Sequence, residues 1–151
     1  MALKFTSVLG KSHREQLEEL MFFHPQQGRF RDTILECIES FGLPRIVVEN
    51  GRLRIALAER IDVQTLYAVL EDSSQSELVG TVVYTRHPSD ELLILHIAIK
   101  EAYTGHGPHA DRMITFAVLD AVCNVARQIK GVNRVRLAYA RGQAVVKTVI
   151  L

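Results

Sequence analysis

Apolar and polar residues recur with two different periods along the chain, and the N-terminal part contains both. A short apolar run over Leu3–Leu9 predicts a strand. Ser12 can cap a following helix, with Glu15 as the third residue of a capping box, and this predicts a helix over about His13–Phe23. Apolar residues at helical spacing predict a second helix over Phe30–Phe41, which ends at a glycine. Two helices therefore precede the first long extended region.

After Arg45 the period changes to two, which indicates strands. Asn50-Gly51 supplies the positive φ angles of a tight turn, and the alternating Leu53 and Ile55 follow it, so the pattern predicts a β-hairpin. Three further extended runs follow between turn-rich segments: VQTLYAVLED, ELVGTVVYTR and ELLILHIAIK. They predict an antiparallel meander, and the nearly all-apolar LLILHIAI predicts a central strand that is covered on both faces.

The longest helix is predicted after the meander. Pro108 suits the first helical position, and apolar residues from Met113 to Ile129 form one broad stripe, so the pattern predicts a helix of about 23 residues that ends before Gly131. The segment NRVRLAYA then alternates as a strand. Strand, helix and strand form a β-α-β unit whose two strands should be parallel. The last residues, GQAVVKTVIL, fit either a short helix or a strand.

The amino-acid composition indicates the kind of domain and gives no reason to expect certain partners. The 151 residues are 48% hydrophobic and 23% charged, which predicts a single soluble globular domain, 1–151. Its predicted helices and mostly antiparallel strands put it in the α+β class. The formal net charge of +1 gives no electrostatic reason to expect a nucleic-acid or membrane partner. The N-terminal apolar run is too short for a signal peptide, and Cys37 and Cys123 lack metal-binding spacing. We therefore expect a cytoplasmic protein with buried free thiols.

The segment TGHGPH, Thr104–His109, concentrates backbone freedom and polar chemistry before the long helix. Gly105 and Gly107 allow a close approach of the backbone, and N–H groups at a helix start favour anions, which together fit a phosphate-binding loop. The same residues also fit a plain helix start, with Gly107-Pro108 as its cap. A metal site is the third possibility, but no metal is predicted, because the spacing of the candidate ligands fixes no coordination geometry. Those ligands would be His106, His109 and Asp111.

The order of the predicted elements resembles the GCN5-related N-acetyltransferase (GNAT) family: a strand, two helices, an antiparallel meander, a glycine loop, a long helix and another strand. The resemblance is strongest over Glu77–Ala140. It implies an α/β/α sandwich around a mixed, mostly antiparallel sheet, with a β-α-β unit near the C-terminus. In the family a Q/R-x-x-G-x-G/A loop binds the pyrophosphate of acetyl-CoA, and this sequence departs from that pattern at Thr104, Pro108 and His109.

This resemblance implies an acyl-CoA-dependent N-acyltransferase. The enzyme would transfer an acetyl group from acetyl-CoA, or the acyl group of another acyl-CoA, to an amine of a small molecule or peptide by direct attack. Ile97 and Ile99 would border the pantetheine. Backbone N–H groups would hold the pyrophosphate, and they belong to Gly105, His106, Gly107, His109 and Ala110. His96 and Glu91 are the candidate general bases, although a lone histidine in an apolar strand is also a common core residue.

Other features fit a different function. Many family members use a tyrosine after the fifth strand as a general acid, and RGQAVVKTVIL contains no tyrosine. A catalytically degenerate acetyltransferase fold with a binding or assembly role is therefore the alternative. The family usually continues into two more strands, whereas this sequence ends at Leu151. We therefore expect an unpaired edge over Val132–Ala140 and a homodimer, in which QAVVKTVIL or its symmetry mate covers that edge.

Overall fold

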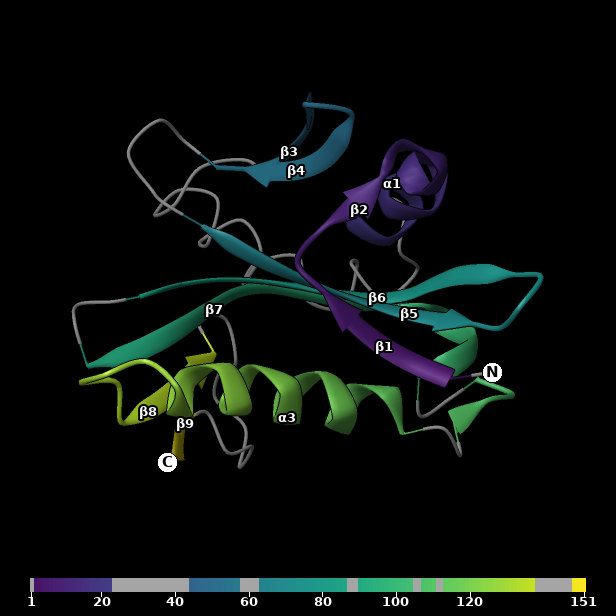
Figure 1. Ribbon diagram of the computed structural model, residues 1–151. Helices are drawn as coiled ribbons and strands as arrows, with labels where there is room; N and C mark the ends of the chain where they lie inside the picture. Colours follow the sequence, from purple (N-terminus) through teal and green to yellow (C-terminus); the bar gives the residue numbers. More distant parts are fainter. Residues whose placement is uncertain are drawn as a thin grey trace.

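The fold places a curled six-stranded sheet between two layers (Figure 1). The computed structural model describes residues 2–22, 44–57, 63–86, 90–104, 107–110, 113–137 and 148–151. Helix α3 (Ile114–Arg127) covers one face of the sheet, and helix α1 (Arg14–Phe22) lies over the other face together with a smaller three-stranded sheet. The protein is therefore of the predicted α+β class.

The main sheet is antiparallel except at one pair of its described strands. Its order is β1-β5-β6-β7-β8-β9. The bounds are β1 (Ala2–Thr6), β5 (Gln64–Glu71), β6 (Ser76–Arg86), β7 (Glu91–Ile99), β8 (Arg134–Leu137) and β9 (Thr148–Ile150). β7 and β8 run parallel, with Glu91 opposite Arg134, and α3 connects them. The predicted meander and the parallel strands of the β-α-β unit are both confirmed.

The Asn50-Gly51 turn forms as predicted. Asn50 has φ 52° and Gly51 has φ 75°, and they join β3 (Arg45–Glu49) to β4 (Arg52–Ala56). This hairpin pairs with β2 (Leu9–Gly10) to form the smaller sheet, in the order β2-β4-β3. The alternating apolar residues of β4 are buried, which is what their period predicts.

The N-terminal run forms two strands instead of the single strand predicted over Leu3–Leu9. Val8 donates its N–H to Thr6 Oγ1 at 3.1 Å, and the same hydroxyl donates to the Val8 carbonyl at 3.0 Å. These local bonds accompany a turn at which the chain leaves the main sheet, so β1 pairs with β5 while β2 pairs with β4. Ser12 also differs from its predicted capping role, because it lies inside a 3-10 turn, η1 (Lys11–His13), that precedes α1.

Two apolar clusters hold the layers onto the sheet. On one face, Val118 and Val122 of α3 pack with Val82 and Ile94 of the strands. The cluster on the opposite face contains Leu17, Leu20, Leu53, Ile55 and Tyr67. Each fully buried aliphatic or aromatic side chain contributes about 1.5–3 kcal/mol through its removal from water. β7 contributes Leu92, Ile94 and Ile99 to the first cluster and Ala98 to the second, and it is mostly buried, as its apolar sequence predicts.

The described cysteine lies in the α3 layer. Cys123 is free and buried, as predicted, and burial raises the pKa of its thiol. Cys37 and the predicted helix over Phe30–Phe41 lie outside the described residues. Within the described part of the chain, no helix is long and apolar enough to span a membrane.

Helix α3 is shorter than predicted and begins later. It has 14 residues and begins at Ile114, not at Pro108. Met113, which precedes it, has φ 52° and ψ 41°, and this left-handed conformation cannot continue a right-handed helix. Pro108 lies in a turn instead. The described residues of the glycine loop are therefore separate from the helix.

The edge of β8 is covered by the same chain. β9 pairs with β8 in the antiparallel direction, with Arg134 opposite Ile150. The end of GQAVVKTVIL is therefore a strand, one of the two possibilities that its sequence leaves open. β9 forms the edge of the main sheet, and its Ile150 side chain is exposed. Association into a homodimer stays a prediction.

Replacement of Gly51 by alanine should lower the free energy of unfolding by about 1 kcal/mol. No atom lies within 4 Å of a Cβ built at this position, so the penalty comes from the φ angle of 75° alone. Urea unfolding followed by circular dichroism measures it. Gly10→Ala is the control, because Gly10 has φ −76° and the atom nearest to its added Cβ is 4.0 Å away. Equal effects of the two replacements would contradict this account of the turn.

Candidate functional site

The connection from β7 to α3 starts at the C-terminal end of β7. It begins with a 3-10 turn, η3 (Glu101–Tyr103), and continues through residues 107–110 to the start of the helix. Of the five residues predicted to hold a pyrophosphate, the structure places Gly107, His109 and Ala110. Gly105 and His106 lie outside the described residues.

Gly107 is packed against the backbone of η3. A Cβ at this position would collide with the Glu101 carbonyl oxygen and with the carbonyl group of Ala102. Its φ angle is not among the positive ones, so close contact explains the glycine here, and conformational freedom does not. The glycine lets the loop fold back onto the turn that precedes it.

The three described N–H groups of the predicted cradle already have acceptors. Gly107 donates to the Thr104 carbonyl at 3.0 Å, His109 donates to the Ala102 carbonyl at 2.7 Å, and Ala110 donates to the Gly107 carbonyl at 3.3 Å. These bonds stabilise the loop itself. A phosphate group would have to replace them or bind to other donors.

Other donors are present at the start of α3. The first intrahelical bond runs from the Ala117 N–H to the Met113 carbonyl at 3.1 Å, and Met113 offers no side-chain cap. The N–H groups of Ile114, Thr115 and Phe116 precede this bond and belong to the first helical turn. Such groups, together with the helix dipole, favour an anion.

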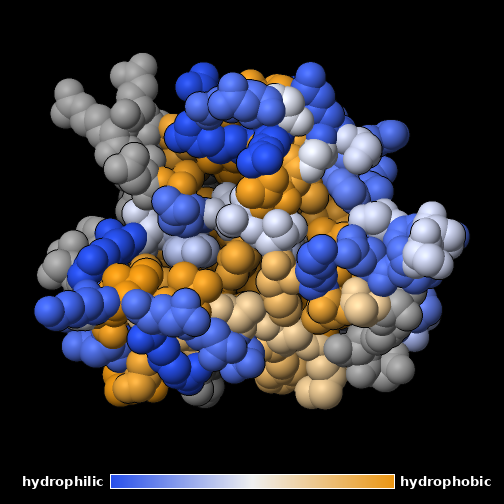
Figure 2. Space-filling model, viewed as in Figure 1, coloured by the Kyte–Doolittle hydropathy of each residue, from blue (hydrophilic) through white to orange (hydrophobic). Residues whose placement is uncertain are grey.

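Apolar side chains are exposed beside these donors. Met113 is 56% exposed and Phe116 is 67% exposed. Figure 2 shows a pale-orange, hydrophobic band over the N-terminal half of α3. The start of the helix therefore combines polar backbone groups with an accessible aromatic ring.

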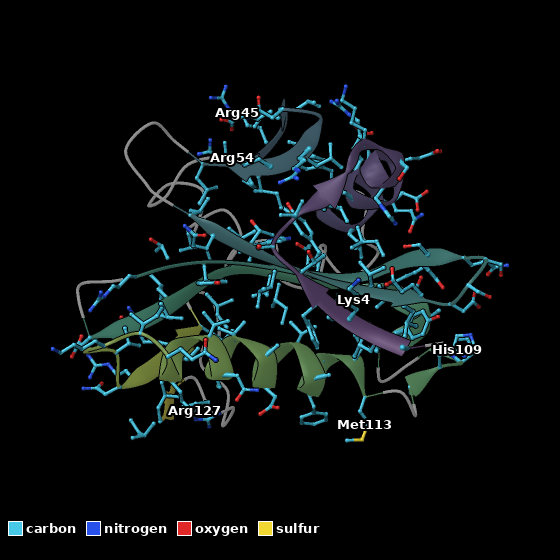
Figure 3. The ribbon with its side chains drawn as sticks, viewed as in Figure 1. Lys4, Arg45, Arg54, His109, Met113 and Arg127 are labelled. Atoms are coloured by element: carbon cyan, nitrogen blue, oxygen red, sulfur yellow. The ribbon has the colours of Figure 1, made fainter. Side chains whose placement is uncertain are left out.

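A polar cluster anchors the loop to β6. Lys100 Nζ lies 2.6 Å from Glu77 Oε1, and the Tyr103 hydroxyl donates to Glu77 Oε2 at 3.1 Å. The Tyr103 ring also lies next to that of His109, at 5.0 Å between centroids, and His109 is visible near the end of the sheet in Figure 3. Neither Glu77 nor Lys100 is a residue that the sequence predicts to be part of the site. The meander itself was the available signal, because pairing Ile99 with Gly80 brings the two residues to the same end of the sheet.

Glu91 lies at the other end of β7, in a buried ion-pair cluster. Its carboxylate is 2.9 Å from Arg134 Nε and 2.9 Å from Arg136 Nη2, and the residue is only 3% exposed. The hydrogen bond from Arg136 is the largest cause that lowers the pKa of this carboxyl group, and Arg134 adds to it against the effect of burial. Eight residue steps of a strand separate Glu91 from Ile99, roughly 26 Å. The structure therefore gives Glu91 two arginine partners far from the loop.

The other candidate residues of β7 face opposite sides of the sheet. His96 is half-buried and pairs with Val83, which belongs to the cluster under α1. Ile97 and Ile99 pack on the α3 side. The register between β6 and β7 shifts next to His96, because Val83 pairs with His96 while Tyr84 pairs with Ile94. This bulge changes which face the following side chains occupy.

Metal coordination finds no support in the described part of the chain, which contains no group of three or more His, Cys, Asp or Glu side chains placed to hold an ion. Two of the residues considered for such a site, His106 and Asp111, lie outside that part.

Comparisons with known proteins add no assignment, since no protein-family model matches the chain and no curated protein matches it significantly.

Gly107→Ala should lower the free energy of unfolding by about 1–3 kcal/mol, because the added Cβ displaces the backbone of η3. Urea unfolding measures this loss without any ligand, and Gly10→Ala again provides the control. Unchanged stability of the Gly107 variant would show that the loop does not pack in this way. If the free energy of unfolding falls, a loss of phosphate binding by Gly107→Ala could come from the changed loop structure, so this variant is not a test of phosphate binding.

Glu91→Gln should lower the free energy of unfolding at neutral pH by roughly 1–3 kcal/mol, since it removes a buried charge partner from two arginines. The folded protein holds the pKa of Glu91 below its ordinary value of 4.5. The contribution is therefore complete above pH 4.5 and is lost as the pH falls through the folded pKa.

Unfolding curves of the wild type and Glu91→Gln should accordingly converge as the pH falls below 4.5. Asp90→Asn is the matched control, because Asp90 is 41% exposed and lies 3.5 Å from Arg134 Nη2. It should cost less than about 1 kcal/mol. A constant gap between wild type and Glu91→Gln from pH 7 to pH 3 would contradict the assigned ion pair.

Proposed function

We propose that this protein is an acyl-CoA-dependent N-acyltransferase. The amine nitrogen of the acceptor attacks the thioester carbonyl carbon, the C–S bond breaks, and the CoA thiolate takes up a proton. The observation that carries the proposal is the parallel pair β7–β8 joined through α3. It agrees with the order of elements in the GNAT family, which the sequence resembles.

The position of the connection after β7 supports a ligand site. In open sheets, ligands bind outside the carboxyl ends of strands, where the connections of neighbouring strands diverge. β7 is such a place, because its antiparallel partner β6 directly precedes it in the order of strands, while its parallel partner β8 follows after a helix on one face of the sheet. The loop and the start of α3 both lie at that end.

The first turn of α3 fits a diphosphate better than the loop does. The N–H groups of Gly107, His109 and Ala110 are engaged in the loop, whereas those of Ile114, Thr115 and Phe116 precede the first intrahelical bond. We therefore assign the diphosphate of acetyl-CoA to the latter three. The exposed Phe116 ring offers a stacking surface to the adenine base.

The two candidate general bases, His96 and Glu91, receive different roles in this proposal. His96 lies in the middle of β7 on the α1 face, opposite from Ile97 and Ile99, so we propose that it accepts the proton of an amine that reaches the thioester from that face. Glu91 is held by Arg134 and Arg136, so we give it a structural role. Ile97 and Ile99, on the α3 side, would line the path of the pantetheine.

A catalytically degenerate acetyltransferase fold remains the second candidate. The engaged loop donors and the ion-paired Glu91 favour it, since both remove groups that a transferase could use. Such a protein would bind CoA thioesters, or another partner, without transfer. Turnover distinguishes the two candidates.

Calorimetric titration should detect binding of acetyl-CoA, and the affinity should fall with added salt because the diphosphate is charged. Thr115→Glu should weaken that binding roughly tenfold by placing a carboxylate beside the diphosphate, while the same charge stabilises the helix start. Thr115→Gln is the neutral control and should bind like the wild type. S-acetylpantetheine, which has no diphosphate, should not distinguish the two variants.

Equal acetyl-CoA affinity of Thr115→Glu and Thr115→Gln would overturn the assigned diphosphate position. Release of free thiol in the presence of a panel of amines tests transfer, and His96→Ala should abolish that release while leaving acetyl-CoA binding intact. Binding with no thiol release would favour the degenerate fold. No binding of acetyl-CoA in a folded sample would refute both the transferase and a degenerate fold that binds CoA thioesters.

A further inference from the structure

A cavity of about 460 Å³ lies between the smaller sheet and β5. Its walls come from the turn between β1 and β2, from the hairpin β3–β4, and from the start of β5. Tyr67, one of its lining residues, belongs to the cluster under α1, so the cavity is on the opposite face of the sheet from α3. Its volume is within the range of small-molecule sites.

The cavity combines an apolar floor with a polar rim. Leu53, Ile55 and Tyr67 are at most 3% exposed and form the floor. Burial raises the pKa of the Tyr67 hydroxyl, and a side-chain hydrogen bond with Thr65 partly offsets this effect. The exposed rim includes Asn50, Arg52 and Gln64. A ligand with one polar end and a short apolar body matches this arrangement.

The charges on the rim favour an anion. Arg52 and Arg54 both line the cavity, together with the carboxylate of Glu49. Glu49 Oε2 lies 3.0 Å from Arg54 Nη1 and so neutralises that arginine. Among the described residues, Arg52 has no ion-pair partner within 4 Å, which leaves one net positive charge among the lining residues Glu49, Arg52 and Arg54.

We propose that this cavity binds a small organic anion. Its carboxylate or phosphate group lies against the Arg52 guanidinium, whose planar fork can donate two parallel hydrogen bonds. Its apolar body lies on Leu53, Ile55 and Tyr67. Asn50, Gln64 and Thr65 supply further hydrogen-bonding groups around the opening.

This site is separate from the one proposed for acetyl-CoA. The cavity reaches Thr65 of β5, which pairs with Val83, and Val83 in turn pairs with His96. These three residues form one row on the same face, so the cavity lies about 10 Å from the His96 backbone, across two strand spacings. The diphosphate site is at the start of α3, on the other face. Anion binding in the cavity therefore does not depend on acyl transfer.

Hexanoate and hexyl phosphate are suitable probes, since they share an alkyl body and differ in the acidic group. Titration of the ¹⁵N-labelled full chain should shift the amide signals of 50–55 and 64–67 at about 10 mM probe. A stronger response to one probe identifies the acidic group that the site prefers. Hexylamine, with the same body and the opposite charge, should leave these signals unchanged.

Two arginine variants test the assigned contact. Arg52→Gln should weaken binding of the anionic probes roughly tenfold. Arg45→Gln is the matched control, because Arg45 belongs to the same hairpin but does not line the cavity, and Figure 3 shows it farther from the main sheet than Arg54. Its affinity should equal that of the wild type.

A third variant should bind the anionic probes more tightly than the wild type. Glu49→Gln removes the carboxylate that neutralises Arg54, so it should strengthen binding of both anionic probes. The proposal is overturned if neither anion shifts these signals, if hexylamine shifts them equally, or if Arg45→Gln loses as much affinity as Arg52→Gln. Circular dichroism spectra confirm that each variant is folded before it is titrated.

Discussion

Strand β7 is paired on both of its edges and packed on both of its faces, and the other elements take their positions from it. It pairs antiparallel with β6 and parallel with β8. A parallel partner cannot be reached through a tight turn, so the chain must cross one face of the sheet, and α3 makes this crossing. The crossing places a loop and a helix start at the C-terminal end of β7. The opposite face remains for α1 and the smaller sheet, and the cavity proposed to bind an organic anion lies between the smaller sheet and β5.

The parts of the fold that local chemistry determines could be predicted from the sequence. Asn50-Gly51 adopts the positive φ angles that its residue types favour, and the period-two segments became strands. The start of α3 could not be predicted, because the left-handed Met113 interrupts an apolar stripe that would otherwise continue as helix. The break between β1 and β2 depends on a hydroxyl bonding to Val8, which competes with the sheet pattern over only a few residues.

The position of the candidate site along the chain could be predicted from the sequence, but the contacts of its residues could not. The glycine loop could be recognised from its residue types, yet Gly107 is required by contact with η3, and its N–H donates within the loop. The partners of Glu91 could not be predicted either, because Arg134 and Arg136 are far from it in the sequence. They contact Glu91 only through the parallel register of β7 and β8. Side-chain roles thus followed from long-range pairing, which residue spacing along the chain does not determine.

The central claim is that the first turn of α3 holds the diphosphate of acetyl-CoA. NMR-detected hydrogen exchange, with and without saturating acetyl-CoA, tests it most directly, because it reports on the individual N–H groups. The account predicts slower exchange at Ile114, Thr115 and Phe116, with no change at Glu91–Leu93. Unchanged exchange in the first turn of α3, at a ligand concentration that calorimetry shows to be saturating, would contradict it.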